Sequence, residues 1–197
     1  MGNTYFTSDT HYGHKNILKF CPESRPFTDV DEMNEALVDR WNAVVNHDDE
    51  VYHLGDVSFT KEGKTLGILS RLNGTKYLVE GNHDKLSPEM RAQWAWVKDY
   101  HELKLNGKKL IMFHYPIEYW NGGHYKGDRQ TWHLHGHSHG GSTFKPGRLD
   151  VGVDTVWSGH RTLDPWSFEE VAAFMEATKD KPADMVKRFG NNKGHHE

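Results

Sequence analysis

Residues 132–141 read W-H-L-H-G-H-S-H-G-G, a stretch with four histidines in seven positions. Side chains two apart in an extended segment point the same way, so we expect His137 and His139 to face one spot. Glycines at positions 136, 140 and 141 let the backbone turn tightly around that spot. Imidazole is the commonest metal ligand among side chains. The stretch therefore indicates a metal site, and a histidine-rich surface loop is the alternative that the rest of the chain has to exclude.

Length and composition limit the class of protein. The 197 residues suffice for one domain, with a core over about residues 4–178 and a polar tail over about 179–197. A formal net charge of −4 argues against a broad surface for duplex nucleic acid. The single cysteine, Cys21, excludes an internal disulfide. No apolar run reaches membrane-spanning length and no signal peptide is recognisable, so we expect a cytoplasmic protein without a membrane partner.

Strand-like and helix-like segments alternate along the chain. A capping box at Thr28-x-x-Asp31 precedes an amphipathic helix of about four turns, and Ser167-x-x-Glu170 caps a last helix. Two further helices are expected around residues 64–72 and 86–97, and Asn106-Gly107 predicts a hairpin. Strands are expected over residues 3–8, 50–54, 75–80, 100–105, 108–113, 131–135 and 148–153. The alternation implies a βαβ framework.

Polar groups able to bind metal follow most of these strands. In order they are Asp9-Thr10-His11, Gly55-Asp56, Gly81-Asn82-His83-Asp84, His114 and Gly136-His137-Ser138-His139. In α/β proteins, ligands bind at the C-terminal ends of the strands. Each group is weak alone, but the series resembles the calcineurin-like metallophosphoesterases, whose pattern is D-x-H, G-D, G-N-H-[DE], H and G-H-x-H. The resemblance runs from about residue 4 to residue 155.

The resemblance implies the metallo-dependent phosphatase fold, an α/β sandwich of two mixed β-sheets flanked by α-helices. It also implies seven metal ligands: Asp9, His11 and His139 for one ion, Asn82, His114 and His137 for the second, and Asp56 as the bridge between them. It makes His83 the catalytic histidine that contacts the phosphate, and Asp84 a residue that orients the His83 imidazole.

The chemistry of these residues agrees with the resemblance. Imidazole and carboxylate ligands without thiolates suit Mn²⁺, which we expect first, and also Zn²⁺, Fe²⁺/Fe³⁺ or Ni²⁺. Two ions ~3.5–4 Å apart can hold both oxygens of an in-line displacement. Asp9 and Asp56 leave such a site positive, which attracts a phosphoester. Metal coordination lowers the pKa of bound water towards ~7 and so supplies a hydroxide nucleophile.

We therefore expect a dinuclear-metal-dependent hydrolase of phosphoester bonds, with nucleotides among its candidate substrates. Protein Ser/Thr phosphatases of this superfamily carry a phosphate-gripping Arg soon after the bridging Asp, whereas this chain reads Val57-Ser58-Phe59. That departure favours a phosphodiesterase, and a phosphomonoesterase is the alternative. A non-catalytic scaffold is expected to have lost ligands. A metal-sequestering protein is expected to cluster them, whereas these extend from Asp9 to His139.

Residues outside the motifs receive weaker assignments. The aromatic and glycine-rich loop Tyr115–Arg129 is expected to form one wall of a substrate cleft. His14, Lys15, Arg25 and Tyr115 are candidates for substrate contact, and a packing or surface role is equally compatible with each. His53, inside a predicted strand, is expected to be a core histidine.

Overall fold

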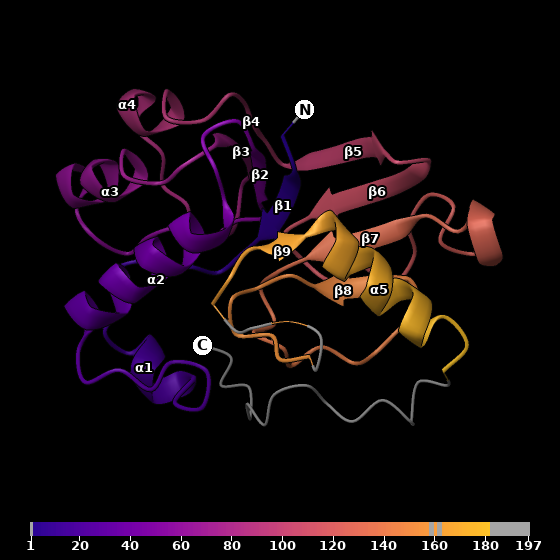
Figure 1. Ribbon diagram of the computed structural model, residues 1–197. Coiled ribbons are helices and arrows are strands. Elements are labelled where there is room, and N and C mark those ends of the chain that lie inside the picture. Colours follow the sequence, from indigo (N-terminus) through magenta and orange to yellow (C-terminus); the bar gives the residue numbers. More distant parts are fainter. Residues whose placement is uncertain (1, 158–159, 161–162, 182–197) are drawn as a thin grey trace.

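Two β-sheets pack against each other in the computed structural model (Figure 1). The structure describes residues 2–157, 160 and 163–181. The first sheet contains, in spatial order, β4 (Val97–Lys98), β3 (Thr75–Val79), β2 (Glu50–His53), β1 (Thr4–Thr7) and β9 (Trp166–Ser167). Strands β1 to β4 are parallel, and β9 pairs antiparallel with β1. The polar tail expected over about 179–197 lies almost wholly outside the described residues.

The second sheet contains β5 (Tyr100–Leu105), β6 (Lys108–Phe113), β7 (Trp132–His135) and β8 (Arg148–Asp150). Strands β5 and β6 are antiparallel, whereas β6, β7 and β8 are parallel. The turn between β5 and β6 has positive φ at both Asn106 (48°) and Gly107 (77°), the backbone that a type I′ hairpin requires. Both sheets are mixed, so the predicted fold class is confirmed.

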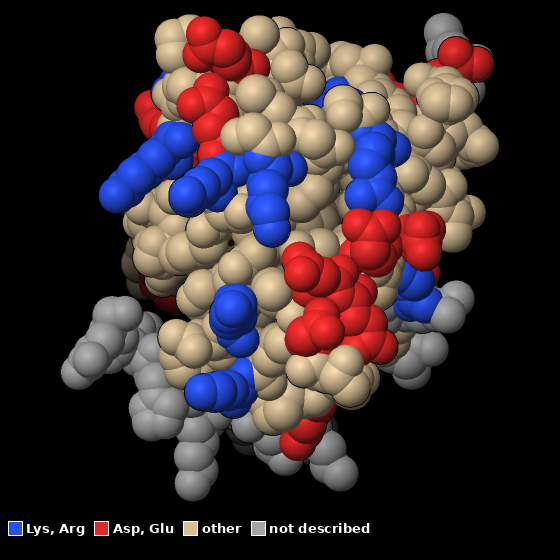
Figure 2. All heavy atoms as spheres, turned by 90° about the vertical axis from the view of Figure 1, so that its left-hand side faces the viewer, with Lys and Arg blue, Asp and Glu red and all other residues tan. Residues whose placement is uncertain are grey.

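Helices cover both outer sides of the sheets (Figure 1). Helices α1 (Ile17–Phe20), α2 (Val30–Val44), α3 (Glu62–Leu69) and α4 (Pro88–Arg91) lie beside the first sheet, and α5 (Phe168–Thr178) lies over β8. A 3-10 turn, η1 (Gly127–Arg129), follows in the long loop after β6. No helix within the described ranges is long and apolar enough to cross a bilayer. The face with α1 to α4 carries separate areas of positive and negative charge (Figure 2).

The core has two parts because the first sheet is buried on both faces. Tyr5 belongs to the cluster that packs α2 against this sheet, whereas its neighbour Phe6 belongs to the cluster between the two sheets and α5. Val51 and Tyr52 on β2 divide in the same way. Alternate residues of a strand point to opposite faces. The strands are therefore clamped on both sides, which gives the loops at their ends a rigid base.

Two predicted helices differ from the structure. The segment 86–97 is helical only over Pro88–Arg91, because the amide of Ala95 and the carbonyl of Trp96 bond to β3. Trp96 and Val97 then pack into opposite clusters, as residues of a strand do. The helix expected around 64–72 begins and ends earlier, at Glu62 and Leu69.

The cap of α2 also differs from the expected box. Asp29, not Thr28, is the N-cap, and its carboxylate accepts from the amides of Asp31 and Glu32. Thr28 instead donates its hydroxyl and its amide to the Glu32 carboxylate. The last helix is capped as predicted, by a complete box between Ser167 and Glu170.

Candidate metal centre

All seven predicted metal ligands follow strands whose C-terminal ends meet where the two sheets adjoin. They are Asp9 and His11 after β1, Asp56 after β2, Asn82 after β3, His114 after β6, and His137 and His139 after β7. Strands β1, β2 and β3 run parallel to one another in the first sheet, and β6 and β7 run parallel in the second, so their C-terminal ends deliver these loops to one edge. The spacing along the chain is large, but the fold brings the groups together.

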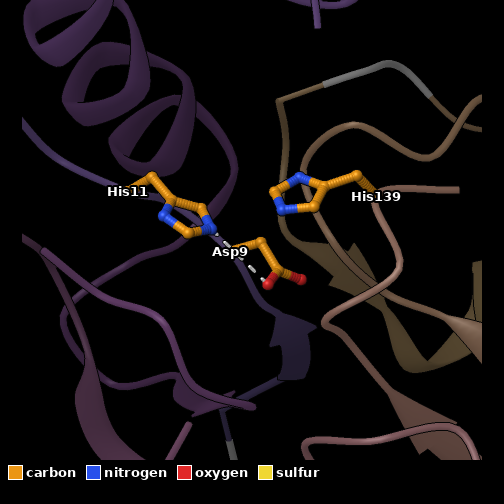
Figure 3. A group of neighbouring side chains, drawn as sticks. All are labelled: Asp9, His11 and His139. Carbon is orange, nitrogen blue, oxygen red and sulfur yellow. Dashed lines mark ion pairs between the residues drawn. The ribbon is translucent and has the colours of Figure 1, made fainter. Parts of the chain in front are cut away.

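The first ligand group contains Asp9, His11 and His139, whose ligand atoms all lie within 4.8 Å of one another. Both imidazoles and the carboxylate point toward a common space (Figure 3). His11 Nε2 lies 3.8 Å from Asp9 Oδ1. Both ring nitrogens of His11 are buried without a hydrogen-bond partner in the described part of the chain. A buried polar atom is costly unless it is paired, so a metal ion is the partner that this group fits.

The second ligand group contains Asp56, His114 and His137, again within 4.8 Å. Asn82 adjoins it, with its Oδ1 atom 3.0 Å from His114 Nε2. Asp56 Oδ2 lies 3.6 Å from His114 Nε2 and also 3.6 Å from His11 Nε2 in the first group. One carboxylate oxygen thus stands between the two groups, where a bridging ligand has to be. The donors are nitrogen and oxygen atoms only, which fits two divalent ions of the kind proposed from the sequence.

The backbone of these loops is unusual. Positive φ angles occur at five of the predicted ligands: Asp9 (56°), His11 (49°), Asp56 (59°), His137 (67°) and His139 (46°). A left-handed conformation costs a non-glycine residue roughly 1–2 kcal/mol. Such strain persists only where the surroundings enforce it, and it concentrates at functional sites.

The expectation that an extended segment aims His137 and His139 at one spot was wrong. Strand β7 ends at His135, and both later histidines take left-handed backbone and join different ligand groups. The Asp9 carboxylate causes part of this turn, because both of its oxygens accept from the His137 amide, at 2.9 and 3.1 Å. Gly136 permits the approach, since a Cβ there would lie 2.5 Å from Asp9 Oδ2.

Hydrogen bonds behind the candidate ligands fix which ring nitrogen is left to face a metal ion. His114 donates from Nδ1 to the Leu54 carbonyl at 2.7 Å, which leaves Nε2 toward Asp56. His139 donates from Nδ1 to Asp154 Oδ2 at 2.7 Å. Metal-binding histidines commonly use their second nitrogen in this way, and the contact fixes the ring orientation and tautomer.

Arg25 and Asp154 form a buried ion pair behind the first group. The guanidinium binds the carboxylate through two contacts of 2.8 Å and also donates to the carbonyls of Asp9 and Thr10. Burial raises the pKa of Asp154, but Arg25 and the contact with His139 lower it far below its ordinary value. Arg25 therefore has a packing and positioning role, not the substrate contact that we considered.

Sequence reasoning missed two carboxylates that hold the histidine loop. Asp154 supports His139, and Asp150 accepts from the Ser138 hydroxyl at 2.6 Å and the Gly140 amide at 2.9 Å. Both lie in R-L-D-V-G-V-D, residues 148–154. The strand predicted over residues 148–153 contains Asp150 and is followed directly by Asp154, which was the only signal that the sequence offered.

Asp84 has different partners from those expected. Its Oδ2 atom accepts from the amides of Asp56 and Gly81, and its Oδ1 atom accepts from the amide of Val57, at 2.8–2.9 Å. None of the described hydrogen bonds joins Asp84 to the His83 ring. Asp84 instead braces the loop that carries Asp56, which corrects the predicted role of imidazole orienter.

His83 lies at the exposed rim of the centre. Its amide donates to Asp56 Oδ1 at 3.0 Å, so its backbone is tied to the carboxylate between the two groups. Its ring packs on Phe59, with centroids 4.8 Å apart, and lies 6.2 Å from the His11 ring. The His83 residue is exposed to solvent beside the two ligand groups.

The remaining candidates divide between rim and core. Tyr115 packs edge-on against the rings of His114 and His137, so the start of the long loop borders the second group. The loop then turns inward, and Trp120 packs on His133. Lys15 is exposed. His53 is a core residue as predicted, 1 % exposed, and burial lowers its pKa to about 3.

Comparisons with known proteins agree with this geometry. The chain matches the Calcineurin-like phosphoesterase superfamily domain over residues 3–185. It is 38% identical over 141 residues to an uncharacterized protein of Methanocaldococcus jannaschii, which covers 71% of this chain and 70% of that protein. It is 33% identical over 168 residues to the Gene 66 protein of Mycobacterium phage L5, covering 71% of this chain and 78% of the relative.

A solved structure of a protein of unknown function from Aquifex aeolicus has the same fold, with a TM-score of 0.66 and 25% identity. The alignment covers 88% of this chain and 100% of the other. The match to the family spans every residue of both ligand groups, and the chain therefore belongs to the calcineurin-like phosphoesterase superfamily and is a metal-dependent hydrolase of phosphoesters.

Proposed function

We propose that this protein is a phosphodiesterase with a dinuclear metal centre. The observation that carries the proposal is the position of Asp56 Oδ2, 3.6 Å from one histidine of each ligand group. The proposed ligands are Asp9, His11 and His139 for one ion, Asn82, His114 and His137 for the other, and Asp56 for both. Manganese is the proposed metal, since the set combines imidazole with carboxylate and amide oxygens.

The chain's own residues divide the work of hydrolysis. When bound, two divalent ions supply Lewis acidity that lowers the pKa of water and neutralises phosphate charge. The carboxylates of Asp9 and Asp56 would bind the two ions, and their two negative charges offset only part of the four positive charges. His83 donates a hydrogen bond to a phosphate oxygen or a proton to the leaving oxygen. The backbone amide of His83 donates a hydrogen bond to Asp56 Oδ1, which holds His83 close to the proposed bridging carboxylate.

The preference for a diester follows from the residues after Asp56. A monoester carries two negative charges and gains most from an added guanidinium, whereas a diester carries one. Phe59 places an aromatic ring beside His83, and Arg25 is buried against Asp154. These surroundings of His83 support the proposed preference for diesters. A phosphomonoesterase is the second candidate, because Lys85 lies in the pocket next to His83.

Hydrolysis of bis-p-nitrophenyl phosphate against p-nitrophenyl phosphate tests the proposal. Metal-stripped protein receives Mn²⁺, Zn²⁺, Ni²⁺ or Mg²⁺, and His83→Ala is compared with His47→Ala. His47 is an exposed histidine before β2, at the opposite end of the first sheet. We expect metal-dependent diester cleavage that falls at least 100-fold in His83→Ala, as loss of a general acid does, and persists in His47→Ala.

Two outcomes would overturn the proposal. Faster cleavage of the monoester would identify a phosphomonoesterase. Turnover of neither ester, in protein that binds two ions, would favour a non-catalytic scaffold.

A further inference from the structure

A pocket of about 320 Å³ opens beside His83, outside the two ligand groups. Its walls come from the loops after β2 and β3, from the start of α3 and from α4, and they include Phe59, Thr60, His83, Lys85 and Met90. The volume is at the lower end of the range of about 300–1,000 Å³ for small-molecule sites. His83 belongs both to the rim of the metal centre and to this pocket, so a phosphoester bound at the metals can extend into it.

Phe59 gives the pocket an aromatic wall. The residue is 40 % exposed, although its ring packs on the rings of His14 at 4.3 Å, His11 at 5.1 Å and His83 at 4.8 Å between centroids. Three imidazoles thus hold the ring in place while part of it remains open. A fixed aromatic surface next to a phosphate site is suited to stack a planar ring, and every nucleobase has such a face.

The other walls are polar. Ser87 donates to Glu62 at 2.6 Å, and both side chains line the pocket together with the exposed Lys85. The pocket therefore combines the apolar side chains of Phe59 and Met90 with hydroxyl, carboxylate and ammonium groups. A nucleoside has the same division, with a planar base and a hydroxyl-bearing sugar.

We propose that this pocket binds the organic group of the phosphoester as a nucleoside, with its base stacked on Phe59. The substrates are then nucleotide esters. This inference rests on the proposed function, because the ligand groups have to place the phosphate before the pocket can receive the rest. Phe59 is the residue that sets the preference for a planar group.

Direct binding of phosphonates tests the pocket without turnover, because their P–C bond is not a phosphoester. Isothermal titration of Mn²⁺-loaded protein compares an adenosine phosphonate, in which CH₂ replaces the bridging oxygen, with the matching ribose phosphonate. Phenylphosphonate and cyclohexylphosphonate form a second pair, which separates planarity from apolar size. We expect the adenosine and phenyl members to bind about tenfold more tightly than their partners, the usual size of base–aromatic stacking.

Two matched variants locate the effect. Phe59→Leu keeps an apolar contact with His11 and should reduce both tenfold preferences to less than twofold, with two Mn²⁺ still bound. Phe20→Leu is the control, since Phe20 is an exposed aromatic residue near His14 that does not line the pocket. It should leave both preferences unchanged.

The outcomes distinguish this inference from the proposed function. Equal affinity for the paired phosphonates in the wild type would overturn the nucleoside pocket, while their shared binding would still support the metal centre. A preference that survives Phe59→Leu would overturn the role of Phe59. Failure of every phosphonate to bind Mn²⁺-loaded protein would instead count against the phosphoester site itself.

Discussion

The two ligand groups are held in place by different physics. Behind the first group, Asp154 connects His139 to the buried Arg25, so its support is an ion pair with both side chains fully buried. Behind the second group, His114 bonds to a backbone carbonyl, and Asp84 bonds to backbone amides around Asp56. The position of the first group therefore depends on a buried pair of opposite charges, whereas the position of the second depends on hydrogen bonds to the backbone.

Removing the charge of Asp154 should have the largest effect. Asp154→Asn leaves Arg25 buried without its counter-ion, which typically costs about 3–5 kcal/mol of stability. It also releases His139 from its partner, so the first ion should bind more weakly than the second. Urea unfolding and metal titration measure the two effects.

An exposed ion pair gives the control for this charge effect. Arg71 binds Glu35 through two contacts on the surface, and Glu35→Gln should cost under ~1 kcal/mol. A loss as small as this in Asp154→Asn would show that the ion pair does not support the first group.

Asp84→Asn should act on the second group. An amide retains one acceptor oxygen but turns an NH₂ group toward backbone amides, so at least one of the three bonds is lost at a cost of about 1–3 kcal/mol. We expect the affinity for the ion at Asp56 to fall, measured by titration of metal-stripped protein.

The same variant separates the two roles considered for Asp84. A positioning role for the Asp56 loop predicts weaker metal binding with an unchanged pH profile of hydrolysis at saturating metal. A shifted pH profile with normal metal affinity would restore the predicted role beside the His83 imidazole.

Acid should lower the stability of both sheets, because each contains a buried neutral histidine, His53 in β2 and His133 in β7. Burial lowers the pKa of His53 and of His133 to about 3. His53 Nδ1 accepts a hydrogen bond from the amide of Gly55, and His133 Nε2 accepts one from the amide of Ile117. A protonated ring has no accepting nitrogen, so these contacts need the neutral form. The unfolded chain takes up protons below about pH 6.5, and stability is therefore lost as the pH falls from 6.5 toward 3.

The size of this loss can be measured one histidine at a time. Between pH 7 and pH 5 each group should contribute about 2 kcal/mol of destabilisation. Urea unfolding of metal-free protein at both pH values should show that His53→Gln or His133→Gln removes that share of the dependence. An unchanged pH dependence in both variants would mean that these rings take up protons as readily in the folded protein as in the unfolded chain.

Motif order predicted which side chains lie together better than local geometry predicted how they are held. Asp9, Asp56 and His114 each follow a predicted strand, and the order of the motifs along the chain was enough to propose them as ligands. The left-handed backbone at His137 was not predictable, because it arises from contact with Asp9, 128 residues away. The roles of Asp154 and Asp84 were likewise set by partners distant in sequence, which no local pattern records.

Helix caps show the same limit at the smallest scale. Thr28 and Asp29 are both good capping residues, so the pattern alone placed the cap one residue early. In the structure Asp29 accepts two amides of the first turn, and Asp29→Ala should cost about 1 kcal/mol of stability in urea unfolding. Since α2 packs on the face of the sheet away from the second sheet, neither ion should bind more weakly. Loss of metal affinity in Asp29→Ala would mean that the two ligand groups depend on α2 as well as on the supports described above.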